Sequence, residues 1–387
     1  MAKAAWGSRS EGLLAQKIGV GWLQNLIKSA LEHPEVNPSK QEHSTAPARI
    51  LVVGVGGAGC NTVSRLASIG ISGAELVAVN TDKLHLESID VPQKVLIGSE
   101  LTKGLSAGGY VEVGRQAASE AKHIFKKLFN NASLVFITSG MGVGTGTGAS
   151  PVIAKFAKEQ GALVIGVVTM PFKLEKARIQ KAKEGLEEFR ESSDSVVVVD
   201  NNRLLALVPD LPIDDAFSVS DEVLARMVKG IIETIMLPSM INLDFADIKT
   251  VLSGSNVAMV GIGESNAKDR AAKAIQQAVS CPLLGDIDYS DAKGVLVHIS
   301  GGPNMTISEA HQIGDFISSR VHAEAQVIWG ARVDPGLGDA IRVILIVNGV
   351  RSPHLLLGPA SDGGVRRREG PSDKMRRGPL DLELNYL

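Results

Sequence analysis

Three glycine-rich segments could bring backbone N–H groups close to an anion. They are GVGGAG (54–59), GLSAGG (104–109) and GMGVGTGTG (140–148), and each precedes a predicted helical segment. Backbone N–H groups at a helix N-terminus bind phosphate oxygens well. Three such loops suit a triphosphate better than the pyrophosphate of a dinucleotide, and the hydroxyls of Thr145 and Thr147 could add contacts. The sequence therefore predicts a site for a nucleoside triphosphate.

The first segment also satisfies the GxGxxG dinucleotide pattern, with Asp82 one strand later. An NAD-dependent oxidoreductase is therefore an alternative, and it would have one phosphate loop and an acid–base centre in a second domain. The sequence offers three loops and no candidate His or Lys centre. P-loop nucleotide hydrolases are excluded, because the sequence contains no GxxxxGK[ST] motif and no Gly-Lys pair.

Two aspartates, Asp244 and Asp247, lie in the segment INLDFADIK, just after a long predicted helix. Two carboxylates beside a triphosphate of the same subunit would repel it, so they fit better against the nucleotide of a neighbouring subunit. There, magnesium would offset the charge and a carboxylate would polarise the attacking water. A structural alternative is open for Asp247, because Asp is a common N-cap of helices.

Short apolar runs rich in β-branched residues alternate with helical segments from Ala48 onward. Runs such as RILVVG, SLVFITSG and SVVVVD lack polar alternation, which indicates strands buried on both faces of a mostly parallel sheet. This alternation predicts a doubly wound α/β domain with its ligand at the carboxyl ends of the strands. We expect this domain over residues 48–238 and a smaller α/β domain over residues 239–350.

A long helix is predicted near the junction of these two domains, ending at Pro238. It carries two adjacent apolar rows at i, i+4 spacing: Val223, Met227, Ile231 and Ile235 beside Leu224, Val228, Ile232 and Met236. An apolar stripe of this width indicates a helix buried between two bodies.

The composition argues against a nucleic-acid-binding protein, a structural zinc site and a membrane-spanning protein. The net charge is −2, so there is no basic excess of the kind that nucleic-acid binders show. The two cysteines, Cys60 and Cys281, are far apart and match no zinc motif, which fits a reducing compartment. No apolar run approaches the ~20 residues of a membrane span, and the first residues do not resemble a signal peptide. We expect a soluble intracellular protein.

A series of motifs, in order along the chain, resembles the FtsZ branch of the tubulin/FtsZ superfamily, in an archaeal-like form. GVGGAGCN, NTDK, SAGG and GMGVGTGTG are similar to its phosphate loops. MPFKLEKAR and DNNRLL resemble its ribose- and base-contacting segments, DAFSVSDEVL the start of its central helix, and INLDFADIKTVLSG its catalytic loop. The resemblance implies a GTPase that polymerises head to tail into cytoplasmic filaments of the prokaryotic division ring. Its active site would be complete only between two subunits.

The resemblance implies a role for each matching residue. Phosphate contacts fall on Gly56, Gly57, Ala58, Gly59, Asn61, Ala107, Gly108, Gly109, Gly142, Gly144, Thr145 and Gly146. The remaining nucleotide-site positions are Cys60, Asp82, Thr147, Pro171, Glu175, Arg178, Asn201, Phe217 and Asp221, and the catalytic ones are Asn242, Asp244 and Asp247. Glu175 and Arg178 would serve the ribose and phosphate edge, and Phe217 would stack on the base.

Guanine would be read by Asn201 and Asp221. A carboxylate that accepts from the N1–H and amino groups of guanine selects guanine over adenine. The nucleotide would be GTP or GDP, with Mg²⁺ held mainly by its phosphates and by water rather than by a protein metal centre.

Three positions depart from the family pattern. Val143 and Ser106 replace common glycines, and Lys176 stands where glycine usually follows the glutamate. The spacing from Glu175 to Arg178 is also one residue shorter than in bacterial members. We expect the intact GTGTG core to preserve binding.

The two ends of the chain read as appendages. Residues 1–47 predict short amphipathic helices that either dock on the first domain or contact a membrane surface or partner. Residues 351–387 read as a flexible tail whose end, LDLELNYL, suits a membrane-tethering adaptor protein; a passive solubilising tail is the alternative. Two further alternatives for the whole chain are a polymer that does not hydrolyse nucleotide and a shape-determining paralogue within the superfamily.

Overall fold

Ten β-strands in the described part of the chain follow the apolar runs of the sequence closely. In this computed structural model, residues 48–203, 212–236, 245–252, 256–281, Leu284, Tyr289 and 292–350 are described. The strands are β1 (Ile50–Val55), β2 (Ala74–Asn80), β3 (Gln93–Leu96), β4 (Leu134–Gly140), β5 (Leu163–Met170), β6 (Ser195–Asp200), β7 (Asn256–Ser265), β8 (Gly294–Gly301), β9 (Gln326–Val333) and β10 (Ile341–Asn348).

These strands form one sheet in the order β3-β2-β1-β4-β5-β6-β7-β10-β8-β9. All pairs from β3 to β6 are parallel, in line with their unbroken apolar sequences. The strand β7 joins β6 in parallel and then pairs antiparallel with β10, which pairs antiparallel with β8. The predicted α/β class with a mostly parallel sheet is confirmed.

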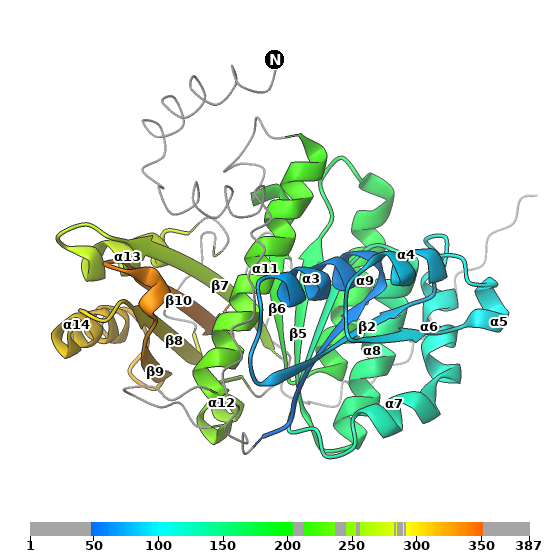
Figure 1. Cartoon of the computed structure of the whole chain (residues 1–387), viewed down its shortest axis with the longest axis horizontal. Helices are drawn as coiled ribbons and strands as arrows, with labels where there is room; N and C mark the ends of the chain where they lie inside the picture. Colours follow the sequence, from blue (N-terminus) through cyan, green and yellow to red (C-terminus); the bar gives the residue numbers. More distant parts are fainter. Residues whose placement is uncertain are drawn as a thin grey trace, which may run out of the picture.

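Helices cover this sheet (Figure 1). They are α3 (Gly56–Ser68), α4 (Lys83–Ser88), α5 (Ser99–Thr102), α6 (Val111–Glu120), α7 (Lys122–Leu128), α8 (Gly144–Glu159), α9 (Lys176–Ser192), α11 (Ile213–Met236), α12 (Phe245–Leu252), α13 (Arg270–Val279) and α14 (Ile307–Ser318), with a 3₁₀ turn, η2 (Pro335–Leu337). The crossovers β1-α3-β2 and β4-α8-β5 run in opposite directions along the sheet, so right-handed connections place α3 and α8 on opposite faces. The helix α3 packs against α11, and α8 packs against α6 and α9. None of the helices within the described ranges is long and apolar enough to cross a membrane.

The helix α11 lies between the two parts of the sheet, as its apolar rows predict. Six of its predicted core side chains are buried: Val223, Leu224, Met227, Val228, Ile231 and Ile232. It contacts α3 on one side and β8 and β9 on the other (Figure 1). The prediction of a helix buried between two bodies is confirmed.

The bounds of the helices show how the glycine segments and the core are built. The helices α3 and α8 begin at Gly56 and Gly144, so glycines of the first and third segments form their first turns. The sequence VGRQAASEAKHIFKKLF (113–129) predicts one helical segment, but the structure divides it at Ala121 into α6 and α7. The second piece, α7, brings Phe125 into the core, where its ring stacks 6.1 Å from that of Phe156. Burial of these rings favours the break over one continuous helix.

Candidate nucleotide-binding site

The first and third glycine segments touch each other at the carboxyl ends of β1 and β4. A methyl group on Gly56 would lie 2.9 Å from the backbone nitrogen of Gly146, closer than packed atoms approach. The N-termini of α3 and α8 therefore meet at one point of the sheet edge. Both helices present unpaired backbone N–H groups and the positive end of their dipoles there.

The second glycine segment lies against the third. A methyl group on Gly144 would be 2.8 Å from Cβ of Ala107, and one on Gly148 would be 1.9 Å from the carbonyl oxygen of Val111. The helix α8 thus packs backbone to backbone on the start of α6, which explains Gly144 and Gly148 by packing alone. Lys181 of α9 donates a hydrogen bond to the carbonyl of Gly109 at 3.0 Å, which ties the second segment to a further helix.

The threonines of GTGTG hold the loops together. The hydroxyls of Thr145 and Thr81 are 2.8 Å apart, which joins the NTDK segment to α8. Thr147 is fully buried, and its hydroxyl accepts a hydrogen bond of 2.8 Å from the backbone N–H of Gly142. The side chain of Thr147 is therefore engaged within its own loop.

The departures from the family pattern are accommodated locally. Val143 is the N-cap of α8 at φ −108°, an extended conformation that suits a β-branched residue, whereas the adjacent Gly142 has φ +95°. The hydroxyl of Ser106 accepts a hydrogen bond of 3.2 Å from the N–H of Gly108, so serine closes a turn here. Lys176 begins α9 directly after Glu175.

Open space lies beside the N-terminus of α3. Among the described residues, no atom of another part of the chain would lie within 4 Å of a methyl group on exposed Gly57, whereas a methyl group on Gly59 would be 2.2 Å from the carbonyl oxygen of Thr138. Packing explains the lack of a side chain at Gly59 but not at Gly57. A ligand that approaches the helix N-terminus would explain it.

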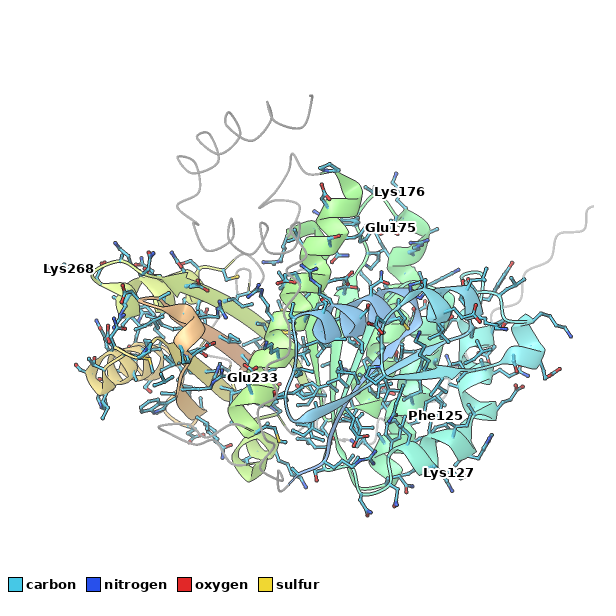
Figure 2. The ribbon with its side chains drawn as sticks, viewed as in Figure 1. Phe125, Lys127, Glu175, Lys176, Glu233 and Lys268 are labelled. Carbon is cyan, nitrogen blue, oxygen red and sulfur yellow. The ribbon has the colours of Figure 1, made fainter. Side chains whose placement is uncertain are left out.

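The segment after β5 forms one edge of the site. Glu175 accepts a hydrogen bond of 3.0 Å from the backbone N–H of Phe172 and pairs with the guanidinium of Arg178. The backbone of Arg178 lies against Gly142, so the shortened spacing still brings Arg178 to the third loop. In Figure 2, Glu175 and Lys176 lie beside each other in the upper part of the view, far from Lys127 of α7 near the bottom. Pro171 is buried, and its carbonyl accepts from the amide of Asn202.

The predicted base-reading residues gather at the start of α11. The ring of Phe217 is 41% exposed and packs edge-on against Phe172, with ring centroids 5.2 Å apart. The amide oxygen of buried Asn201 accepts a hydrogen bond of 3.1 Å from the hydroxyl of Ser220. The carboxylate of Asp221 accepts one of 3.1 Å from Thr62.

Burial changes the acidity of Asp221. Desolvation raises its pKa to about 7, although the hydrogen bond from Thr62 and the positive charge of Arg65 act in the opposite direction. This carboxyl group therefore changes charge near neutral pH.

Asn61 and Asp82 surround a histidine that sequence reasoning missed. The Nε2 atom of His85 lies 3.0 Å from the amide oxygen of Asn61, and its Nδ1 lies 3.2 Å from the amide nitrogen of Asn80. A tautomer protonated at Nε2 satisfies both contacts and turns the amide oxygen of Asn61 toward the imidazole. One oxygen of Asp82 accepts from the N–H of His85 and caps α4.

Cys60 belongs to the core. Its thiol donates to the carbonyls of Gly54 and Val79, and burial raises its pKa to about 12. Only its backbone could therefore face a ligand.

Four residues with contacts at the site were not among the predicted site residues, and only one of them could have been predicted from a sequence motif. Asn202 lies in the quoted motif DNNRLL, so its link from β6 to residues 171–173 was open to prediction. The partnerships of Thr62, His85 and Phe172 depend on tertiary contacts that no local pattern encodes.

Of the three predicted catalytic residues, the structure describes only the position of Asp247. Asn242 and Asp244 lie outside the described residues, and Asp247 lies within the first turn of α12, which begins at Phe245. Asp247 is therefore not the N-cap of that helix. Within the described part of the chain, no group of three or more His, Cys, Asp or Glu residues could hold a metal ion.

Comparison with known proteins agrees with this geometry. Residues 49–209 match the Tubulin/FtsZ family, GTPase domain, and residues 256–351 match the FtsZ family, C-terminal domain. Cell division protein FtsZ 2 of Methanocaldococcus jannaschii is 53% identical over 86% of this chain and 88% of its own length. Cell division protein FtsZ 2 of Halobacterium salinarum is 46% identical, over 93% of this chain and 91% of its own.

A solved structure shares the fold. The empty FtsZ dimer of M. jannaschii has a TM-score of 0.76 and 44% identity, covering 79% of this chain and 89% of that one. The family's GTPase domain implies binding of GTP or GDP, and the relatives support self-association. The oxidoreductase alternative has no such support. With both of its domains matched and about half of its residues identical to a full-length relative, this chain belongs to the FtsZ family of cell-division proteins.

Proposed function

We propose that this protein assembles head to tail into filaments of the cytoplasmic division ring and hydrolyses GTP between subunits. The guanine would be held by Asn201, Phe217 and Asp221, the ribose edge by Glu175 and Arg178, and the phosphates by the three glycine segments. Mg²⁺ would accompany the phosphates. The acidic residues Asp244 and Asp247 would act on the nucleotide of the adjacent subunit, with Asn242 beside them.

The position of α12 relative to the base-reading residues carries this proposal. Asp221 lies near the start of α11, and α12 follows its far end at Met236, 15 residues later (236 − 221). At 1.5 Å per residue these points are about 22 Å apart along the helix. In Figure 1, α12 lies at the lower end of α11. An acidic loop at this end would reach a nucleotide only in another subunit.

Exposed apolar side chains support an interface at the nucleotide end. Leu84, Leu101, Leu105, Tyr110, Leu174 and Phe217 are all exposed and lie on segments that surround the site. Water-exposed apolar groups near one site favour coverage by another protein surface. A second copy of this chain fits, because self-association is supported by the relatives.

GTP turnover per subunit is expected to rise with protein concentration. At low concentration most subunits lack a neighbour, so few active sites are complete. The test follows phosphate release across a dilution series, with light scattering in parallel and GDP and ATP as controls. A turnover number independent of concentration would contradict a shared active site.

The affinity for GTP is expected to fall as the pH falls below about 7, the pKa of Asp221. Guanine needs the ionised carboxylate as acceptor, so below this pKa binding must first remove a proton. Affinity should then fall by about tenfold per pH unit and level off above pH 7. Phosphate groups titrate near pH 6 as well. The Asp221→Asn variant is the control, since it keeps the phosphate contribution but should lose the step due to Asp221. If GTP affinity depended on pH in the same way in both proteins, Asp221 would not take part in recognition of the base.

The roles of both chain ends stay proposals. The tail, residues 351–387, would bind a membrane-tethering adaptor, and residues 1–47 would dock on the first domain. Both segments lie outside the described residues.

A further inference from the structure

A row of polar contacts joins α3 to α11 behind the proposed guanine site. Thr62 of α3 bonds to Asp221, and Arg65, one turn later, pairs with Glu222. Glu222 is fully buried and also pairs with Arg226. The helix that begins at the phosphate loop is thus linked to the helix that carries the base-reading carboxylate.

Thr62 has one hydroxyl proton and two acceptors for it. Its Oγ1 lies 3.1 Å from Oδ1 of Asp221 and 3.1 Å from the carbonyl oxygen of Ala58 in the first glycine segment. Because Thr62 is only 1% exposed, water does not compete for this proton. A hydrogen bond to an ionised acceptor is stronger than one to a neutral carbonyl. The ionised carboxylate therefore takes the proton, and a neutral carboxyl group would leave it to Ala58.

The second oxygen of Asp221 has no donor in the part of the chain that the structure describes. Its Oδ1 is held by Thr62, and Asn201 is already engaged with Ser220. A carboxylate fixed through one oxygen can present the other in a constant direction. Guanine offers two adjacent donors, N1–H and the amino group, which such a carboxylate can accept.

We propose that Thr62 is a positioning residue for guanine recognition, which holds the carboxylate of Asp221 in the orientation and charge state that the base requires. This inference rests on the proposed function. Thr62 itself need not touch the nucleotide, since its effect passes through Asp221.

The charges around Asp221 support a specific role for the hydroxyl. The nearby cation from α3 is Arg65, and the charged neighbours from α11 are Glu222 and Arg226. The guanidinium of Arg65 also forms an ion pair with Glu222, so its charge does not act on Asp221 alone. The hydrogen bond from Thr62 is the larger of the two causes that lower the pKa of Asp221 against desolvation. Removal of the hydroxyl should therefore move ionisation of Asp221 to higher pH.

The test compares Thr62→Val, which replaces the hydroxyl by a methyl group, with Thr62→Ala and with Thr62→Ser, which retains the hydroxyl. Equilibrium binding of GTP is measured from pH 6 to pH 9, and each affinity is divided by that of the unchanged protein at the same pH. The effect of phosphate protonation on affinity is the same in both proteins, so it cancels in this ratio.

We expect Thr62→Val and Thr62→Ala to bind GTP about tenfold more weakly at pH 7, with the loss shrinking toward pH 9 as Asp221 ionises. The serine variant should restore the original profile. Thermal unfolding confirms that each variant is folded.

A loss of equal size at every pH would indicate a merely structural role and overturn the proposal, as would unchanged binding. If the valine variant does not fold, the alanine variant decides between these results. Failure of the unchanged protein to bind GTP would instead overturn the proposed function, so the two failures are distinguishable.

Discussion

Replacing Gly57 by alanine is expected to leave the fold intact and to weaken GTP binding about tenfold or more. The new methyl group meets no other segment within 4 Å in the part of the chain that the structure describes, and alanine is a better helix former than glycine. The free energy of unfolding should therefore stay constant or rise by up to ~1 kcal/mol. The methyl group would occupy the space that we assign to phosphate, and such overpacking costs about 1–3 kcal/mol. Thermal unfolding and equilibrium GTP binding measure the two effects separately.

Gly59→Ala is the matched control in the same helix. Its methyl group would lie 2.2 Å from the carbonyl oxygen of Thr138, which is backbone and cannot move aside cheaply. We expect the free energy of unfolding to fall by about 3 kcal/mol, with binding lost as a consequence. Normal GTP affinity in Gly57→Ala would show that the phosphates do not lie beside the N-terminus of α3.

Asp244→Ala is expected to keep GTP affinity within about twofold and to lower turnover by at least about 100-fold. The proposed base-reading residue Asp221 lies in the first half of α11, whereas α12 follows the far end of that helix, so we expect the substitution to leave the pocket of its own subunit unchanged. Loss of a carboxylate that polarises water removes a general-base contribution of this size. Asp269→Ala, which removes an exposed aspartate from the C-terminal part, is the control and should leave turnover unchanged.

A mixing experiment tests whether Asp244 acts across the interface. Asp244→Ala supplies an intact pocket, and Gly57→Ala supplies an intact acidic loop. In an equal mixture, roughly a quarter of head-to-tail contacts would combine the two intact parts. At a GTP concentration that fills the unaltered pocket but not the Gly57→Ala pocket, turnover of the mixture should exceed that of either variant alone. Additive rates with no gain would place Asp244 in the pocket of its own subunit, and loss of GTP binding by Asp244→Ala would contradict its assignment.

The sequence predicted the strands and the gathering of glycine segments because both depend on local pattern. Unbroken apolar runs such as SVVVVD favour strands buried on both faces of a parallel sheet, and the carboxyl ends of parallel strands lie at the same edge of the sheet. The two apolar rows on α11 likewise predicted that this helix is buried between two parts of the protein, and it contacts α3 in one part and β8 and β9 in the other.

Predictions were weaker where a residue's partner lies far along the chain. The dense glycines of GTGTG suggest ligand contact alone, yet Gly148 is explained by the carbonyl of Val111, 37 residues earlier (148 − 111). Thr62 and Asp221 are separated by 159 residues, so their hydrogen bond could not be inferred from spacing. The division at Ala121 has no helix-breaking residue in the sequence, and it accompanies packing of Phe125 against Phe156 of another helix.

The backbone contact between α6 and α8 has a consequence for the thermodynamics of nucleotide binding. Glycine loses more chain entropy on ordering than any other residue. Here Gly144 and Gly148 are already fixed by Ala107 and Val111. That entropy is lost during folding, so a ligand need not order this loop again. A rigid cradle of this kind favours binding with little coupled folding, and hence a small change in heat capacity at the phosphate end of the site.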